Sequence, residues 1–275
     1  MFNAVLAASR GAVMQIQDEY GQFCGRIKQL TGIDLSGYKE KQMRRRLESQ
    51  MARRGISSFP VYYDLLSRDA AALQEFLDRV TINVSEFFRN AERWQVLAQT
   101  IIPTLEQSSG GRGLQIWSAA CSTGEEPYSL AMLLSADFPR IRWQLLATDI
   151  DRVILGRAKQ AEYLLAQLPQ IPERFRKRYV SPGDTRFKID SAITSLVELR
   201  QHDLLREPFP ERQDLIICRN VMIYFTEDIK DRLYRSFAAS LRPGGVLFVG
   251  STEQIFRSRE YGLRVIEPFF YQKIE

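Results

Sequence analysis

The stretch Ile116-Trp-Ser-Ala-Ala-Cys-Ser-Thr-Gly-Glu-Glu-Pro-Tyr-Ser-Leu-Ala131 decides the fold of this 275-residue chain. A buried strand over 114–117 leads into a run of small residues over 118–124, and a helix follows over 128–134. Pro127 suits the first turn of that helix, where its missing N–H is not needed. Small residues between a strand and a helix let a ligand approach the main chain closely. The pattern predicts a binding turn in a parallel α/β sheet.

Two carboxylates, Glu125 and Glu126, stand at the mouth of this helix. A phosphate-binding turn should not carry two negative charges there. The acids favour a ligand with hydroxyl groups or a cationic group, such as a nucleoside or a sulfonium compound. The alternative is a tight strand-to-helix turn whose acids merely complement the helix N-terminus.

Composition limits the classes of protein that the chain can represent. Hydrophobic residues make up 45% of the sequence, enough for a soluble core, and the net charge of +5 is too small to require nucleic acid. Three scattered cysteines lack zinc spacing and form no disulfide framework. Because the cysteines lack zinc spacing, we expect no metal. Since no signal peptide or membrane span is apparent, we expect a cytoplasmic protein. The single histidine, His202, is the one candidate histidine base, although a structural role is commoner.

The N-terminal part, up to about residue 110, has helical periodicity. A helix is predicted over about 38–54, with Met43, Leu47 and Met51 as its buried stripe. The rest of this helix is strongly basic. That face is either simply solvated or a docking surface for an acidic partner. Its candidate partner-binding residues are Lys41, Arg44, Arg45, Arg46 and Arg53.

Polar residues alternate with apolar ones just before the α/β part begins. Asn83, Ser85 and Arg89 are interleaved with Val84, Phe87 and Phe88. These polar groups are either caps and surface groups, or ligand contacts at a junction between domains, where binding clefts are common.

From Leu114 the sequence alternates between strands and helices, which predicts a parallel sheet with helices on both faces. Asp149 ends the second strand, where an acidic residue suits ribose hydroxyls; Asp151 fits the role of a helix cap better. Asn220 ends a later central strand, at the edge where open α/β sheets bind ligands, and Tyr224 follows. Alternatively Asn220 caps a turn and Tyr224 packs in the core. A hairpin over 263–273 should close the sheet.

The alternation is interrupted over about 160–200. Short strand-like pieces at 179–180, 186–189 and 196–199 predict a small antiparallel β-insert. Such an insert is either a device for binding a partner or a cover for a sheet edge.

Five motifs in order together resemble the CheR family of chemotaxis receptor methyltransferases. They are Asn83-Val-Ser-Glu-Phe-Phe-Arg89, Ser118-Ala-Ala-Cys-Ser-Thr-Gly-Glu-Glu-Pro-Tyr-Ser129, Ala147-Thr-Asp-Ile-Asp151, Cys218-Arg-Asn-Val-Met-Ile-Tyr-Phe225 and Leu241-Arg-Pro-Gly-Gly245. The resemblance covers about residues 18–273. It implies a Rossmann-like methyltransferase sheet with an all-α N-terminal domain and an antiparallel β-insert. The expected domains are 1–90, helical, and 91–275, methyltransferase, with the insert over 160–200.

The resemblance also implies S-adenosylmethionine as cofactor and S-adenosylhomocysteine as product. It assigns cofactor contacts to Asn83, Ser85, Arg89, Glu125, Asp149, Asp203, Leu204, Asn220 and Val221. Arg89 and Tyr224 are the residues expected at the transferred methyl group. We choose Glu125 over Glu126 as the residue facing the cofactor. Position 203 is commonly Asn in the family, and Asp203 can accept a hydrogen bond from an adenine amino group but cannot donate one.

The implied reaction is methylation of glutamate carboxylates in the cytoplasmic helices of chemotaxis receptors. A carboxylate is ionised at neutral pH and needs no general base, which suits a chain with one histidine. Acidic receptor helices would complement the basic helix. Some family members hold a receptor C-terminal peptide on the β-insert, but the turn over 181–185 is shorter here, which argues against such a peptide. We expect a monomer that neither binds nucleic acid nor inserts into a membrane.

Two other classes remain open on the sequence alone. Asn220-Val-Met-Ile-Tyr224 loosely resembles an amine-methylation motif, without its prolines, and a nucleic-acid methyltransferase would bind phosphate through its basic surface. A methyltransferase domain that binds cofactor without catalysis is the second alternative. A dinucleotide oxidoreductase is disfavoured because no glycine-rich phosphate turn is present.

Overall fold

The computed structural model describes residues 19–80 and 85–274 of the chain, which forms two compact units. One unit ends at Ile82 and also includes Tyr224–Thr226; the other comprises Asn83–Ile223 and Glu227–Glu275. This division lies earlier than the expected boundary at residue 90. The reason is that Phe87 and Phe88 pack in the second unit, where Phe88 stacks on Phe175 at a centroid distance of 5.1 Å.

The first unit is a small helical domain. A helix over 19–31 is followed by η1 (Leu35–Gly37), α2 (Glu40–Arg53), α3 (Phe59–Arg68) and α4 (Ala70–Val80). Its core is aromatic, because Phe23 contacts Phe59, Tyr62 and Phe76 within 6.1 Å between ring centroids. Met43, Leu47 and Met51 are buried on α2, so the expected apolar stripe forms.

Tyr224–Thr226 belongs to this helical domain by its main-chain bonds. Lys39 N–H donates to the Tyr224 carbonyl at 2.8 Å, and Thr226 N–H donates to the Gly37 carbonyl at 3.1 Å. Phe225 forms an isolated antiparallel bridge with Tyr38. The segment therefore completes the helical domain although it is distant from it in sequence.

The second unit is built on a seven-stranded sheet in the order β6-β2-β1-β7-β8-β10-β9. Strands β6, β2, β1, β7 and β8 are parallel, and β10 is antiparallel to both β8 and β9. The terminal hairpin therefore closes the sheet as expected. The strands are β1 (Leu114–Ala119), β2 (Trp143–Asp149), β6 (Val197–Gln201), β7 (Gln213–Cys218), β8 (Leu241–Val249), β9 (Leu263–Glu267) and β10 (Phe270–Lys273).

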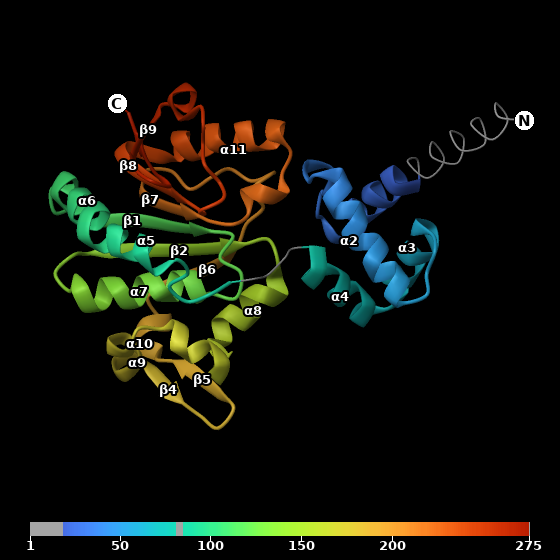
Figure 1. Ribbon diagram of the computed structural model, residues 1–275, viewed down its shortest axis with the longest axis horizontal. Coiled ribbons are helices and arrows are strands. Elements are labelled where there is room, and N and C mark those ends of the chain that lie inside the picture. The colour runs from blue at the N-terminus through green and yellow to red at the C-terminus, as the bar shows by residue number, and fades with distance from the viewer. Residues whose placement is uncertain (1–18, 81–84, 275) are drawn as a thin grey trace, which may run out of the picture. The chain divides into compact units, whose positions relative to one another are not determined.

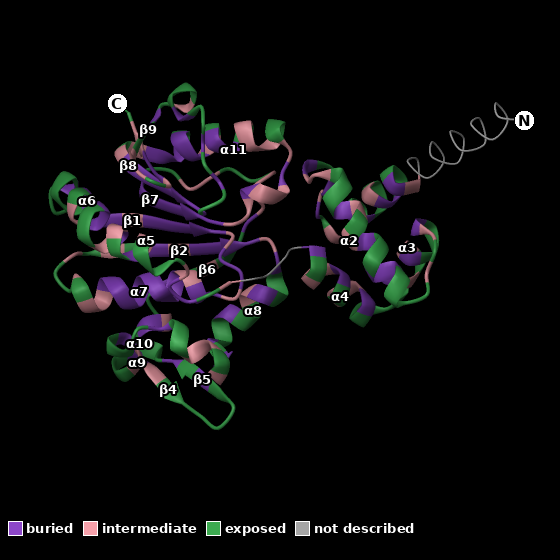
Figure 2. Cartoon of the chain, in the orientation of Figure 1, coloured by how far each residue is buried: buried purple, intermediate pink, exposed green. Residues whose placement is uncertain are grey.

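Helices cover both faces of this sheet, and Figure 1 shows α7 and α11 on opposite sides of it. The central strands are buried, as the purple ribbons of β1, β2, β7 and β8 show in Figure 2. This burial explains the nearly continuous apolar runs in the sequence. The helical elements are α5 (Ala91–Val96), the π-helical turn η2 (Leu97–Ile101), α6 (Ile102–Ser109), α7 (Glu125–Asp137), α8 (Arg152–Gln160), η4 (Met222–Tyr224), α11 (Glu227–Ser240) and η5 (Ser258–Tyr261).

The β-insert contains a three-stranded antiparallel sheet in the order β3-β5-β4, with helical turns around it. The strand-like piece expected at 196–199 is not part of it. That piece is β6, which pairs in parallel with β2 at the edge of the main sheet, from Leu145↔Val197 to Asp149↔Gln201. The insert comprises β3 (Glu162–Leu164), η3 (Leu165–Gln170), α9 (Glu173–Tyr179), β4 (Val180–Pro182), β5 (Arg186–Ile189) and α10 (Ser191–Thr194).

Within 19–80 and 85–274, no helix combines the length and apolar character needed to cross a bilayer. Cys121 and Cys218 are buried free thiols, and Cys24 is a half-buried one.

Candidate functional site

The carboxyl ends of five parallel strands meet at one edge of the main sheet. Strand β1 lies between β2 and β7, so the strand order changes direction there. Crevices at such a point, beyond the carboxyl ends of the strands, are where open α/β sheets bind ligands. The segments that follow β1, β2, β6, β7 and β8 therefore define the candidate site.

The turn after β1 has unusual backbone geometry. Ala120 and Ser122 adopt positive φ angles of 59° and 51°, and Gly124 has a φ of 93°. A Cβ at Gly124 would lie 2.9 Å from the Tyr128 ring, so glycine is required by both conformation and space. The Ser122 hydroxyl is buried without a hydrogen-bond partner in the described structure. A buried unpaired hydroxyl in a strained turn is a site where a ligand can supply the missing bond.

Asp149 ends β2 beside this turn. Its Oδ2 accepts a hydrogen bond from Ser122 N–H at 2.8 Å, and its Oδ1 accepts one from Asp151 N–H at 3.1 Å. Burial raises the pKa of the Asp149 carboxyl to about 6. Asp151, not Asp149, caps α8 by accepting from Val153 and Ile154 N–H, as expected. Asp149 thus fixes the turn after β1 and places a buried carboxylate at the strand end.

The two glutamates at the start of α7 have different surroundings. Glu125 is buried and accepts hydrogen bonds from Thr123 Oγ1 at 2.6 Å and from Gln167 Nε2 of the β-insert at 3.2 Å. Glu126 accepts from Ser118 Oγ at 2.9 Å and lies 3.5 Å from the Arg219 guanidinium. Burial raises the pKa of Glu126, and the Arg219 charge opposes that rise. Glu126 is therefore held by an internal ion pair, whereas Glu125 joins the turn to the insert.

Arg219, directly after β7, connects three parts of the site. Its guanidinium donates to the Arg89 carbonyl at 2.9 Å and to Asn90 Oδ1 at 2.8 Å, in addition to pairing with Glu126. It also lies over the Phe248 ring at 4.7 Å from the centroid. Arg219 therefore brings the main chain of the 85–90 segment to the carboxyl edge of the sheet.

The Arg89 side chain itself is about one-third exposed, and among the described residues it forms one marginal ion pair, 4.0 Å from Glu86. Ser85 is half-buried, and Asn83 lies outside the described residues. The structure thus brings Arg89 into the site and leaves its guanidinium accessible.

The segments after β6 and β7 hold the remaining expected cofactor contacts. Asp203 accepts from Leu205 N–H at 2.8 Å and pairs with Arg206 at 3.7 Å, while Leu204 is half-buried. Asn220 adopts a positive φ of 62°, and Val221 beside it is half-buried. His202 is buried with its Nε2 3.1 Å from the Pro208 carbonyl and its ring against Trp117, which supports a structural role.

In the helical domain, the Arg46 guanidinium lies over the Tyr224 ring, 5.6 Å from its centroid, and donates to the Arg79 carbonyl. Arg44 pairs with Glu48 at 3.0 Å. The remaining bases of α2 are exposed and form no ion pair with another described residue: Lys41, Arg45 and Arg53. Of the five expected partner-binding residues, Arg44 and Arg46 therefore contact other residues of the helical domain, and the other three are exposed.

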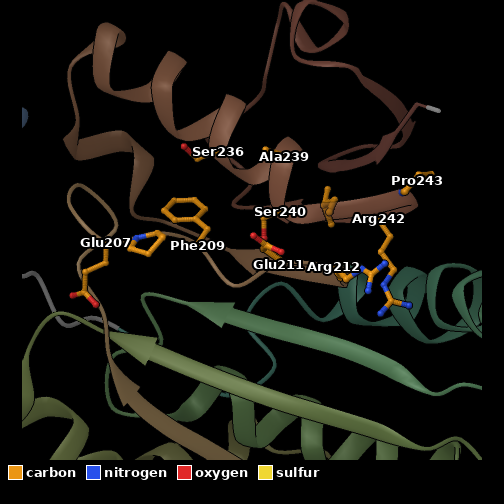
Figure 3. A pocket seen from close by; sticks show the side chains of 11 residues that line it. Glu207, Phe209, Glu211, Arg212, Ser236, Ala239, Ser240, Arg242 and Pro243 are labelled. Carbon is orange, nitrogen blue, oxygen red and sulfur yellow. The ribbon is translucent and has the colours of Figure 1, made fainter.

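A cavity of about 810 Å³ lies elsewhere, beside the starts of β7 and β8 and the end of α11 (Figure 3). Phe209, Ser240 and Arg242 are among its lining residues, and no expected site residue lines it. The motif Leu241–Gly245 lies at the start of β8, beside this cavity. The motifs that follow β1, β2 and β7, which hold most of the expected site residues, lie beyond the carboxyl ends of those strands, and we assign the chemistry to that edge.

The donor set at the carboxyl edge fits S-adenosylmethionine. Asp149 is a buried carboxylate at the end of β2, Ser122 offers an unpaired hydroxyl, and no glycine-rich phosphate turn is present. Fold and site together define an α/β methyltransferase of the class that uses this cofactor rather than a dinucleotide enzyme.

Comparison with known proteins identifies the family. Residues 18–81 match the CheR methyltransferase all-alpha domain, and residues 83–267 match the CheR methyltransferase SAM binding domain. The chain therefore belongs to the CheR methyltransferase family. It is similar to a chemotaxis protein methyltransferase of Listeria innocua, with 42% identity over 95% of this chain and 99% of the relative. A chemotaxis protein methyltransferase 2 of Pseudomonas aeruginosa is 34% identical over 92% of this chain and 93% of its own length.

Reasoning from the sequence missed two residues at the site. Arg219 stood inside a quoted motif, but its connecting role depends on Arg89 and Glu126, which are distant in sequence. Glu253 follows β8 and is buried against the segment after β7. The rule that ligands bind beyond the ends of parallel strands could have drawn attention to Ser251-Thr-Glu-Gln254.

Proposed function

We propose that this protein transfers the methyl group of S-adenosylmethionine to glutamate side-chain carboxylates of chemotaxis receptors, which forms methyl esters during sensory adaptation. The observation that carries the proposal is the 42% identity, over nearly the whole of both chains, to a chemotaxis protein methyltransferase. The reaction is intracellular in this proposal, and the three free cysteines suit a reducing compartment.

The chemistry requires little beyond positioning. When bound, the cofactor supplies a methyl group on a positively charged sulfur. A glutamate acceptor is ionised at neutral pH, so the protein needs no general base to activate it. The absence of a role for His202 agrees with this, since that ring is packed against Trp117. The residues of the site would act by orienting the two reactants in line and excluding water.

Asp149 would hold the ribose hydroxyls, because a carboxylate can accept from both. Ser122 lies beside it and could satisfy its unpaired hydroxyl with the same ligand. Glu125 is the preferred carboxylate for the cationic end of the cofactor, because Glu126 is already paired with Arg219. We extend the pocket to Asn83, Ser85, Asp203, Leu204, Asn220 and Val221, as the family resemblance implies.

Arg89 and Tyr224 are the proposed residues at the methyl group. The accessible guanidinium of Arg89 can bind a carboxylate, which we assign to the cofactor. Tyr224 ends the motif that begins at Asn220. Replacing Tyr224 by Phe should lower turnover at saturating cofactor while leaving cofactor affinity unchanged. Equal turnover of the variant and the wild type would remove the Tyr224 hydroxyl from the mechanism.

The receptor would dock on the exposed bases of α2, which we call the basic face: Lys41, Arg45 and Arg53. At 3.6 residues per turn these residues lie within about 120° of one another around the helix axis, away from the buried stripe of α2. Arg44 and Arg46 are partly committed to Glu48 and Tyr224 and would contribute less. An acidic methylation helix is the complementary partner.

We assign no receptor C-terminal peptide to the β-insert. The β4–β5 hairpin turns within residues 183–185, where Gly183 N–H donates to the Arg186 carbonyl at 2.8 Å. Titration of the insert with such a peptide tests this assignment, and saturable binding would overturn it.

Labelled methyl transfer to receptor-enriched membranes, followed by mild alkali, tests the function. Release of the label by alkali identifies a carboxyl ester and supports the proposal. Alkali-stable label, or label incorporated into added DNA or RNA, would instead support an amine methyltransferase. Cofactor binding without any transfer to receptors or nucleic acid would favour a non-catalytic module.

A further inference from the structure

Glu253 occupies an unusual place at the carboxyl edge of the sheet. It follows β8 in the turn over 250–253, and only 4% of its surface is exposed. Within the described chain no lysine or arginine lies within ion-pair distance of its carboxylate. Burying a glutamate carboxylate without a cationic partner normally costs a large desolvation free energy, so other interactions must offset that cost.

Four main-chain N–H groups donate hydrogen bonds to the Glu253 carboxylate and offset this cost. Glu253 Oε2 accepts from Asn220 N–H at 2.6 Å and from Gly250 N–H at 2.8 Å. Its Oε1 accepts from Met222 N–H at 2.6 Å and from Ile223 N–H at 3.3 Å. A carboxylate has about four acceptor sites, so these bonds use its full capacity. The side chain has no acceptor left for a substrate, and its role must be exerted through the main chain that it binds.

Three of these donors belong to the segment 220–223, which follows β7 and begins with the left-handed Asn220. An isolated segment in that conformation would be strained, and three bonds to one anion can hold it in place. Gly250 is needed for the approach, because a Cβ there would lie 2.5 Å from Glu253 Oε2 and 2.8 Å from Asn220 N. Ile223, which the carboxylate also binds, immediately precedes Tyr224.

We propose that Glu253 is a positioning residue for the cofactor site, which sets the direction of Asn220 and the start of the segment that leads to Tyr224. This inference rests on the proposed function, because that function is what makes the segment part of a cofactor site. A glutamine could not replace it, because the amide NH₂ would face two main-chain N–H donors where Glu253 presents an acceptor oxygen. The requirement is therefore for an ionised carboxylate rather than for a side chain of this shape.

Protonation should have the same effect as the glutamine. Burial raises the pKa of the Glu253 carboxyl, and its main-chain bonds oppose that rise. The charged or titratable groups that interact with it electrostatically come from four segments: Glu126 on α7, Cys218 on β7, Arg219 after β7 and Tyr234 on α11. Glu253 also lines a cavity of about 410 Å³, together with Glu227, Lys230, Arg257, Tyr261 and others.

The test compares Glu253→Gln with Glu260→Gln, which changes an exposed glutamate of the same region. Calorimetric titration with S-adenosylhomocysteine should show affinity reduced about tenfold or more in the first variant, as expected for lost charge-assisted bonds. The control should bind like the wild type. Affinity of Glu253→Gln within about twofold of wild type would overturn the proposal.

A second measurement on the wild type holds even if Glu253→Gln fails to fold. In a pH titration followed by NMR, the amide protons of Asn220, Met222 and Gly250 should shift together with one midpoint above 4.5, the usual pKa of a glutamate. Independent or absent shifts of these amides would refute their common attachment. Neither measurement needs a methyl acceptor, so a wild type that transfers no methyl group would refute the proposed function and leave these results interpretable.

Discussion

Cofactor affinity should depend on the ionisation of Asp149. Burial raises the pKa of this carboxyl from 3.8 to about 6. A pKa difference of about two units means that ionising this carboxyl costs about 3 kcal/mol more in the folded protein than in the unfolded chain. Because the folded-state pKa is raised, this contribution stabilises the fold below about pH 3.8 and is lost as pH rises through about 6. At neutral pH the ionised Asp149 therefore lowers the stability of the fold. We expect that this ionised carboxylate is kept because it binds the cofactor.

That reason is tested by the affinity for S-adenosylhomocysteine between pH 5 and pH 8. Only the ionised carboxylate can accept from two ribose hydroxyls while it also accepts from Ser122 and Asp151 N–H. If the neutral form does not bind, the dissociation constant at pH 5 should be about tenfold higher than at pH 7. Isothermal calorimetry measures this directly in the wild type.

Two variants give the comparison. Asp149→Asn should bind weakly and show no inflection near pH 6, because the titrating group is gone. Asp184→Asn changes an exposed aspartate of the β4–β5 turn and should keep the wild-type profile. A wild-type affinity that is flat between pH 5 and pH 7, or an Asp149→Asn variant that retains the inflection, would refute the role of Asp149.

Three further results are expected. Arg89→Ala should raise the cofactor dissociation constant severalfold in calorimetry, and unchanged binding would exclude Arg89 from the pocket. Arg219→Met should lower stability to urea by about 3–5 kcal/mol because it leaves Glu126 buried and unpaired, and adding Glu126→Gln should recover much of that loss. Neutralising the basic face should raise receptor KM and weaken its salt dependence, whereas neutralising exposed Lys177 should do neither.

Much of the fold could be predicted from the sequence because its signals are local. The small-residue run after Trp117 and the alternation of apolar strands with helices both survive in the structure. The place of β6 was not predictable in the same way. Val197 and the residues after it have the short alternating pattern of an edge strand, and that pattern does not say which sheet provides the neighbour.

The position of a site residue could be predicted where it follows from the residue's own strand or turn. It could not be predicted where it depends on contacts with residues distant in sequence. Asp149 could be placed because it ends a strand. Glu253 could not, because Ser251-Thr-Glu-Gln254 has the composition of a surface turn, and its burial depends on main-chain donors about thirty residues away. Arg219 likewise acquires its role only when Arg89 and Glu126 meet it.

The way the β-insert joins the chain bears on the length that its tip can have. Ile189 N–H donates to the Ala161 carbonyl at 3.0 Å, so the strands of the insert enter and leave at neighbouring points. The tip at 183–185 belongs to neither the main sheet nor its carboxyl edge. Each doubling of a loop costs only about 0.6 kcal/mol of closure entropy. A longer tip would therefore cost the fold little free energy, and it would extend the insert without altering the carboxyl edge of the main sheet.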